Sequence, residues 1–220
     1  AHRVDVDRYA YRARELGDKA SMARSLIRTQ YFDDFWPEYR NQSRTNAEEA
    51  LRLGQELGDE DVIIDATRAT LRFMTEGEAK AQAEELQKKL ESREDLLRLK
   101  ELRFQMMWLY YSAADFEKCV ESCDAGIELA SRIGTRPVQY PTIKALALLD
   151  LGRFGDAWAS LQQEVADERH PFGRAHKAMG VGAYLVEVMD FDEAVPVLRK
   201  VAADAKALRR AWMGRLTLGL

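Results

Sequence analysis

The stretch Met-Asp-Phe-Asp-Glu-Ala at residues 189–194 has two earlier counterparts in the chain, and their spacing decides the predicted fold. The counterparts are Ala-Asp-Phe-Glu-Lys-Cys at 114–119 and Gly-Arg-Phe-Gly-Asp-Ala at 152–157. In each copy an aromatic residue is followed three positions later by a small residue. The aromatic residues at 116, 154 and 191 lie 38 and 37 positions apart. A fixed period of this length indicates a repeat architecture.

The same phase extends toward the N-terminus. Ala79 lies 37 positions before the first of these aromatic residues, and Tyr39 lies 40 positions before Ala79. We expect each of the five positions to open a helix. The Asp-x-x-Glu sequence at 190–193 has the spacing of a capping box. Pro37 suits a first helical position, because proline has no N–H group to satisfy there.

Apolar residues recur with a helical period behind these starts. Two such stripes are Phe154, Trp158, Leu161 and Val165, and Phe191, Val195, Leu198 and Ala202. A second helix precedes each start, as in the apolar run at 143–149. Helix-stop and capping residues fall at Gly17-Asp18, Gly58-Asp59, Ser92, Gly134-Thr135 and His170-Pro171. The repeating unit is therefore predicted to be an antiparallel helix pair.

Five such units are expected, and the first two are degenerate. They cover roughly residues 19–58, 60–92, 95–134, 137–168 and 171–204, with a leading half-unit near 4–16 and a trailing helix near 206–218.

The units resemble tetratricopeptide repeats. In that family a small residue of the first helix allows close helix contact, and Ala145 and Gly182 match it. Phe116, Phe154 and Phe191 match the aromatic position, and Ala157 and Ala194 match the alanine that follows. The chain departs from the family in three ways. Its period of 37–40 residues is longer than the family's, which is about 34 residues. It also lacks the closing proline and has Gln42 and Gln82 where alanine is usual. The resemblance implies an all-α fold, a right-handed α-solenoid of stacked antiparallel helix pairs.

Two Glu-Leu-Gly-Asp tags, at 15–18 and 56–59, are similar to those of a longer-repeat subgroup. That subgroup occurs in multidomain bacterial signalling proteins such as maltose-regulator-type transcription activators and class III nucleotide cyclases. The resemblance implies a regulatory domain in a cytoplasmic protein. Because the chain begins with Ala1 rather than Met, we expect it to be a fragment of a longer protein.

Composition limits the partners. Charged residues make up 32% of the 220 residues, the net charge is −4 and no block of Lys or Arg occurs, so direct nucleic-acid contact is disfavoured. No apolar run is long enough to span a bilayer. We therefore expect a protein or peptide partner, or a second copy of the chain, and no membrane contact.

Features that resemble catalytic or metal sites have simpler interpretations. Cys119 and Cys123 are four residues apart and are expected to fill one helix face rather than to hold zinc or form a redox pair. Gly180-Val181-Gly182 lacks a third glycine and is attributed to close helix packing. His170 and His176 are attributed to a helix start rather than to acid–base catalysis. We expect no enzyme activity, no cofactor and no metal.

Binding is expected on the concave face, which in the tetratricopeptide family is lined by the first helices. The corresponding positions are Tyr31, Leu71, Glu101, Phe104, Trp108, Tyr111, Gln139, Thr142, His176 and Met179. The aromatic members would supply burial, and polar members such as Gln139 would set orientation. The run at 106–111 is apolar nearly all round. Its aromatic residues, with Phe104, are therefore either a binding patch or part of a central helix that its neighbours bury on both sides.

Two alternative functions remain open. The apolar C-terminal stretch with Trp212, Met213 and Leu216 is a candidate oligomer interface, although truncation before further repeats explains it more simply. A small-molecule-sensing domain would need an enclosed apolar pocket, with Trp108 as a wall.

Overall fold

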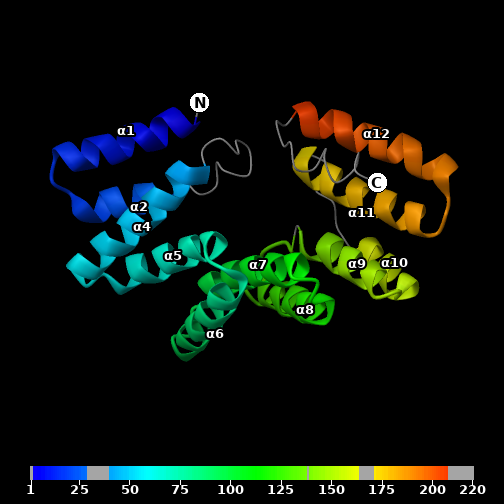
Figure 1. Cartoon of the computed structure of the whole chain (residues 1–220), viewed down its shortest axis with the longest axis horizontal. Coiled ribbons are helices and arrows are strands. Elements are labelled where there is room, and N and C mark those ends of the chain that lie inside the picture. Colours follow the sequence, from blue (N-terminus) through cyan, green and yellow to red (C-terminus); the bar gives the residue numbers. More distant parts are fainter. Residues whose placement is uncertain (1, 29–39, 138, 164–170, 208–220) are drawn as a thin grey trace. The chain divides into compact units, whose positions relative to one another are not determined.

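The computed structural model describes residues 2–28, 40–137, 139–163 and 171–207. Within these ranges the chain is all-α, with eleven α-helices and one short 3-10 helix (Figure 1). None of the described helices is both long enough and apolar enough to cross a membrane. Contacts between Cα atoms divide the chain into two units, Ala1–Lys88 and Lys89–Leu220. The boundary falls inside helix α6 (Glu76–Ser92).

In the first unit, each of the leading helices packs against the next one in sequence. They are α1 (His2–Glu15), α2 (Lys19–Arg28), α4 (Arg40–Leu57) and α5 (Glu60–Thr70), and the 3-10 helix η2 (Leu71–Phe73) follows before α6 begins. Helix α2 also contacts α5, so the first helices of two predicted units lie together. The core of this unit includes Met22, Leu26, Leu53 and Val62, all at most 7% exposed.

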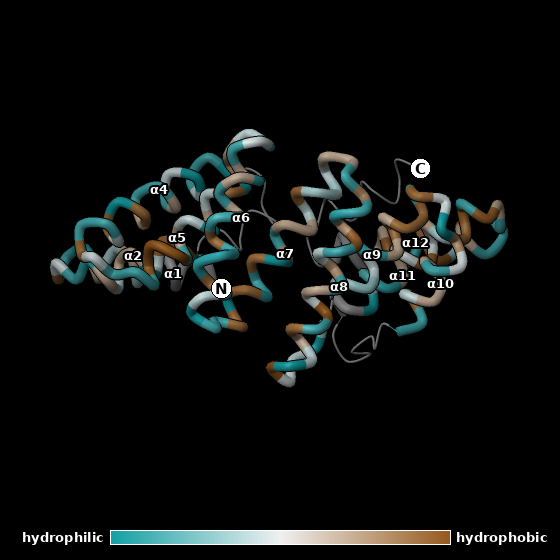
Figure 2. The backbone as a smooth tube through the Cα atoms, turned by 90° about the horizontal axis from the view of Figure 1, so that it is seen from below, coloured by the Kyte–Doolittle hydropathy of each residue, from teal (hydrophilic) through white to brown (hydrophobic). Residues whose placement is uncertain are grey.

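The second unit repeats this arrangement with six helices. They are α7 (Leu96–Ser112), α8 (Phe116–Arg132), α9 (Tyr140–Asp150), α10 (Phe154–Gln163), α11 (Pro171–Glu187) and α12 (Phe191–Ala207). Consecutive helices pack together, and α9 also contacts α7 and α11. Along the helices of Figure 2, hydrophobic and hydrophilic residues alternate, as amphipathic helices require. The expectation of an all-α array of sequential helix pairs is confirmed.

Most of the predicted helix starts that fall on described residues agree with the structure. Helices α8, α10 and α12 begin at Phe116, Phe154 and Phe191. Helix α6, by contrast, begins three residues before Ala79, because Glu78 reaches back to Thr75 and forms one half of a capping box. The Thr75 hydroxyl lies 2.6 Å from the Glu78 carboxylate, which also accepts from the Thr75 N–H. Tyr39 and most of the predicted trailing helix lie outside the described residues.

One type of turn joins most of the neighbouring helices. Seven described turns hold a residue with positive φ: Gly17, Gly58, Glu94, Ala114, Gly134, Gly152 and Met189. The N–H of the next residue donates to the carbonyl five positions back, at 2.8–3.1 Å, as in Asp115 to Tyr110. This is the Schellman motif, which satisfies carbonyls that a helix end would leave unpaired.

The residue after the left-handed position commonly caps the next helix. The side chains of Asp18, Asp59, Asp95 and Asp190 accept from the N–H three residues on, at 3.0–3.3 Å. The predicted role of Asp190 is therefore confirmed. One dipeptide thus ends a helix and begins its successor, and this is the reason for the repeated Gly-Asp signals.

Glycines within the helices allow close contacts between neighbours. A Cβ at Gly126 of α8 would lie 2.2 Å from the Tyr140 ring of α9, and one at Gly182 would lie 2.4 Å from Leu198 of α12. A Cβ at Gly180 would lie 2.6 Å from the Leu161 side chain and 3.0 Å from the Thr142 side chain. The attribution of Gly180 and Gly182 to packing is confirmed.

The apolar stripe predicted for α10 is partly wrong. Leu161 is buried, but Phe154 and Trp158 are 40% and 39% exposed. The helix instead buries Ala157 and Ser160 beside Leu161, and the Ser160 hydroxyl donates to the Pro141 carbonyl at 2.9 Å. Phe191 and Val195 of α12 are also exposed, and Val165 lies outside the described residues. Helix α10 therefore packs against its neighbours mainly through the face that carries Ala157, Ser160 and Leu161.

Replacing Ala114 by glycine should raise the unfolding free energy by up to ~1 kcal/mol, because its φ of 56° is costly for a residue with a Cβ. Thermal melts and urea titrations measure the change. Ala113→Gly is the control, since Ala113 has a φ of −87° and should lose ~0.5–1 kcal/mol. Equal effects of the two substitutions would contradict this account of the turn.

Replacing Gly126 by alanine should cost ~1–3 kcal/mol, because the new Cβ would overlap the Tyr140 ring. Gly155→Ala is the matched control within a helix, since a Cβ there meets nothing within 4 Å. That control should be stabilised by ~0.5–1 kcal/mol through helix propensity. Calorimetry of the two variants should therefore give shifts of opposite sign.

Candidate binding surface on helix α7

Helix α7 begins at a capped turn and is apolar around most of its circumference. Asp95 accepts from the Arg98 N–H at 3.1 Å, and its carboxylate also binds the Arg98 guanidinium at 2.8 Å. Leu102, Met106 and Met107 are almost fully buried. The predicted core role of Met106, Met107 and Tyr110 is confirmed.

A second face of α7 carries three aromatic side chains, Phe104, Trp108 and Tyr111. We call them the aromatic row. Their spacing of four and three residues places them on one helix face, and all three are half-buried. Glu101 lies one turn earlier on the same face and is also half-buried.

Each end of the aromatic row contacts helix α9. The rings of Phe104 and Tyr140 meet edge to face, with centroids 6.0 Å apart and an interplanar angle of 89°. At the other end, the Tyr111 hydroxyl lies near the carboxylate of Asp150, the last residue of α9. Burial, and then the Asp150 carboxylate, raise the pKa of Tyr111. Helix α9 therefore lies against both outer members of the row.

The middle of the row is packed by aromatic neighbours. Trp108 and Tyr111 have ring centroids 6.3 Å apart and nearly perpendicular planes. Tyr111 also meets Phe116 at the start of α8, at 5.7 Å. Edge-to-face pairs of this kind add to the free energy of burial. The rings are thus held in place while part of each remains exposed.

Tyr140 contacts several parts of this arrangement at once. Its hydroxyl donates to the Lys100 carbonyl of α7 at 2.5 Å, and its side chain is 4% exposed. Burial raises the pKa of Tyr140, followed by the nearby Cys123 and Glu101 groups, with Arg103 opposing. The same ring occupies the place that a Cβ of Gly126 would take, so one side chain contacts α7, α8 and α9.

The remaining predicted groove residues fall into two groups. Gln139, the residue before α9, is half-buried. Leu71, Thr142, His176 and Met179 are buried, with at most 3% exposure. Thr142 lies against Gly180 of the packed helix α11, which explains its burial. That these residues line a binding groove stays a prediction. Tyr31, Trp212, Met213 and Leu216 lie outside the described residues.

Sequence reasoning missed a second apolar surface, on α10, α11 and the turn that follows. The Trp158 and Tyr184 rings lie against each other with centroids 4.9 Å apart and planes tilted by 35°, and Met189 is 74% exposed. The signal was present in the small residues Ala157 and Ser160, which mark the opposite face of α10 as the packed one.

The cysteines occupy the position expected from the sequence. Cys119 and Cys123 are free thiols with no exposure, on the buried face of α8. Burial, and then a hydrogen bond with Cys119, raise the pKa of the Cys123 thiol. A thiol with a raised pKa is a poor nucleophile at neutral pH. Among the described residues, no group of His, Cys, Asp or Glu is arranged to hold a metal ion.

No protein-family model matches the chain, and a search of curated proteins finds no match either. The tetratricopeptide resemblance therefore rests on the residues quoted above.

The Tyr140 hydroxyl should make stability depend on pH in the alkaline range. Its pKa is raised in the folded state, so above about pH 10 the unfolded chain loses a proton that the folded chain keeps. The unfolding free energy should then fall with an extra slope of up to ~1.4 kcal/mol per pH unit. Tyr140→Phe should be less stable at pH 8 by ~1 kcal/mol, from the lost hydrogen bond.

Urea titrations of wild type and Tyr140→Phe between pH 8 and about pH 11 measure this difference. The two curves should converge as the pH rises. Parallel curves would show that the Tyr140 hydroxyl ionises equally in both states.

Proposed function

We propose that the chain is a non-catalytic, tetratricopeptide-like interaction module that binds a segment of a partner protein at the aromatic row. The observation that carries the proposal is the row itself, three half-buried rings held by edge-to-face contacts of Phe104 with Tyr140 and of Trp108 with Tyr111. Such rings lose little conformational freedom on binding and offer large contact areas, the properties of hot-spot residues.

The helix arrangement supports this function. Contacts between α7, α9 and α11, the first helices of successive pairs, are those that a stacked repeat array makes. In the proposed right-handed solenoid these helices line the concave side. The half-buried polar side chains of Glu101 and Gln139 flank the row and would orient the bound segment.

The proposed partner segment presents apolar side chains to the row. Its backbone loses freedom on docking, so we expect modest affinity unless several helices are engaged. By the resemblance described above, the module would belong to a bacterial signalling or transcription-regulatory protein of the cytoplasm. There, partner binding would be coupled to an effector domain.

A displayed library of random peptides, selected on the immobilised chain, tests the proposal. Trp108→Ala should weaken the selected peptides by about tenfold or more, because truncating a central aromatic residue removes most of its burial. Trp158→Ala is the matched control, since Trp158 is a 39% exposed tryptophan on another helix. Affinities are measured by fluorescence anisotropy of labelled peptides.

The result expected is a loss in the Trp108 variant alone, with both variants melting as folded proteins. Peptides that depend on Trp158 and not on Trp108 would move the site to the α10–α11 surface. A library that yields no saturable binder would contradict peptide binding by the row.

A further inference from the structure

A second exposed apolar surface lies at one end of helices α10, α11 and α12. Its members come from the start of α10, the end of α11, the turn that follows and the start of α12: Phe154, Trp158, Tyr184, Val188, Met189 and Phe191. We call it the α10–α11 surface. Segments 164–170 and 208–220, which the structure does not describe, adjoin the other ends of these helices.

Contacts within and between the helices join these residues into one surface. The rings of Trp158 and Tyr184 connect α10 to α11, with centroids 4.9 Å apart. Phe154 lies one turn before Trp158, and Val188 lies one turn after Tyr184, so each pair shares a helix face. The turn residue Met189 follows directly, and α12 begins two residues later.

The exposed area of this surface is large for a single chain. Phe191 is 51% exposed and Met189 is 74% exposed, and Phe154, Trp158 and Val188 are 39–42% exposed. With about 200 Å² for a large side chain, these fractions correspond to roughly 400–500 Å² of exposed area. A stable interface buries about 800 Å² per partner, of which about two thirds is apolar in homodimers. The surface therefore supplies most of the apolar area that one partner of a dimer needs.

Met189 occupies a backbone position at which glycine is the favourable residue. Its φ of 62° lies in the left-handed region, and four of the seven described turns of this type have glycine there. A side chain at this φ costs free energy of folding, and leaving an apolar side chain in water forgoes the gain from its burial. A strained and exposed residue of this kind indicates a role other than folding of the single chain.

The surface offers complementary groups to a second copy of itself. Methionine sulfur makes favourable contacts with aromatic rings. The same surface carries the 74% exposed Met189 beside the partly exposed rings of Phe154 and Trp158. In a two-fold interface, each contact from one copy to the other occurs twice. Met189 of each copy can therefore pack on the aromatic rings of the other.

Charges around the surface suit the same arrangement. Arg153 directly precedes α10, whereas Glu187 and Asp192 flank Met189, and all three charged side chains are exposed. Placing Met189 on the start of α10 in another copy brings these carboxylates toward Arg153 of that copy. Arg153 lies 2.7 Å from Asp156 in its own helix, but both side chains are more than half exposed, so this pair contributes little.

We propose that two copies of the chain dimerise through their α10–α11 surfaces in a two-fold arrangement. Met189 of each copy packs against Phe154 and Trp158 of the other, and the opposite charges at the rim orient the two copies. The aromatic row lies on α7, so dimerisation and the binding of a partner segment are separate properties, and either can fail without the other. A dimer presents two aromatic rows, which strengthens the binding of a bivalent partner.

Sedimentation equilibrium over roughly 1–200 µM protein measures the dissociation constant of the dimer. Met189→Gly should raise this constant by about tenfold or more, because it removes a central apolar side chain. The same substitution relieves the left-handed strain, so the monomer should melt up to ~4 °C higher than the wild-type monomer. Loss of the dimer in this variant is then not a result of unfolding.

Two matched controls separate the interface from general effects. Ala114→Gly makes the same backbone change in another turn and should leave the dissociation constant within about twofold of wild type. Arg153→Glu should weaken the dimer by about fivefold or more, since it places like charges together. Arg12→Glu also alters an exposed pair with a carboxylate three residues on and should have little effect. Equal weakening by the two arginine variants would show a general charge effect and overturn the arrangement.

A wild-type chain that stays monomeric over the whole concentration range would overturn the proposal. A dimer that Met189→Gly leaves intact would overturn it as well. If Trp212→Glu disrupts the dimer and Met189→Gly does not, the interface belongs to the apolar C-terminal stretch instead of the α10–α11 surface.

Discussion

Seven described reversals of the chain between neighbouring helices depend on one backbone residue in the left-handed conformation. That residue allows the Schellman hydrogen bond, and the residue after it caps the next helix, as at Met189 and Asp190. Six of these seven turns are two or three residues long, so the second helix must return along the first, while the connection from α8 to α9 has seven residues. Small residues such as Gly126 then decide how closely the helices approach.

The aromatic row depends on this geometry. Tyr140 reaches the Lys100 carbonyl and the Phe104 ring only because α9 packs close to both α7 and α8. Asp150 meets Tyr111 because α9 ends one helix length later, beside the end of α7. The positions of the exposed rings are therefore set by backbone turns and glycines that would not contact a partner themselves.

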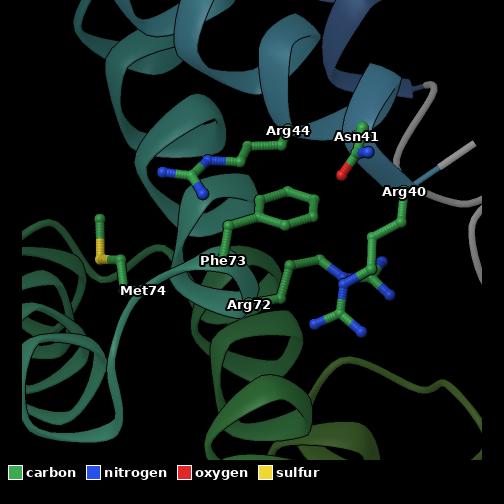
Figure 3. Close-up of a pocket in the computed structure, with 6 residues that line it drawn as sticks. All are labelled: Arg40, Asn41, Arg44, Arg72, Phe73 and Met74. Carbon is green, nitrogen blue, oxygen red and sulfur yellow. The ribbon is translucent and has the colours of Figure 1, made fainter.

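The sequence predicted the helix starts well, because turns and caps are local and leave residue-specific signals at Phe116, Phe154 and Phe191. It predicted the buried faces less well. A helical period places Phe154 and Trp158 on one stripe, but only the neighbouring helices determine that Ala157 and Ser160 face the contact. The small cavity lined by Arg40, Arg44 and Arg72 (Figure 3) left no signal in the sequence, because Arg40 and Arg72 are 32 positions apart and come together only through folding.

Packing between sequence neighbours also has a consequence for how the chain folds. Each helix–helix contact described here closes a loop shorter than about two helix pairs, so the loop-closure entropy for each step is small. Low contact order of this kind is associated with fast folding. Folding can then nucleate at any helix pair with a favourable turn and propagate to its neighbours, as in one-dimensional repeat arrays.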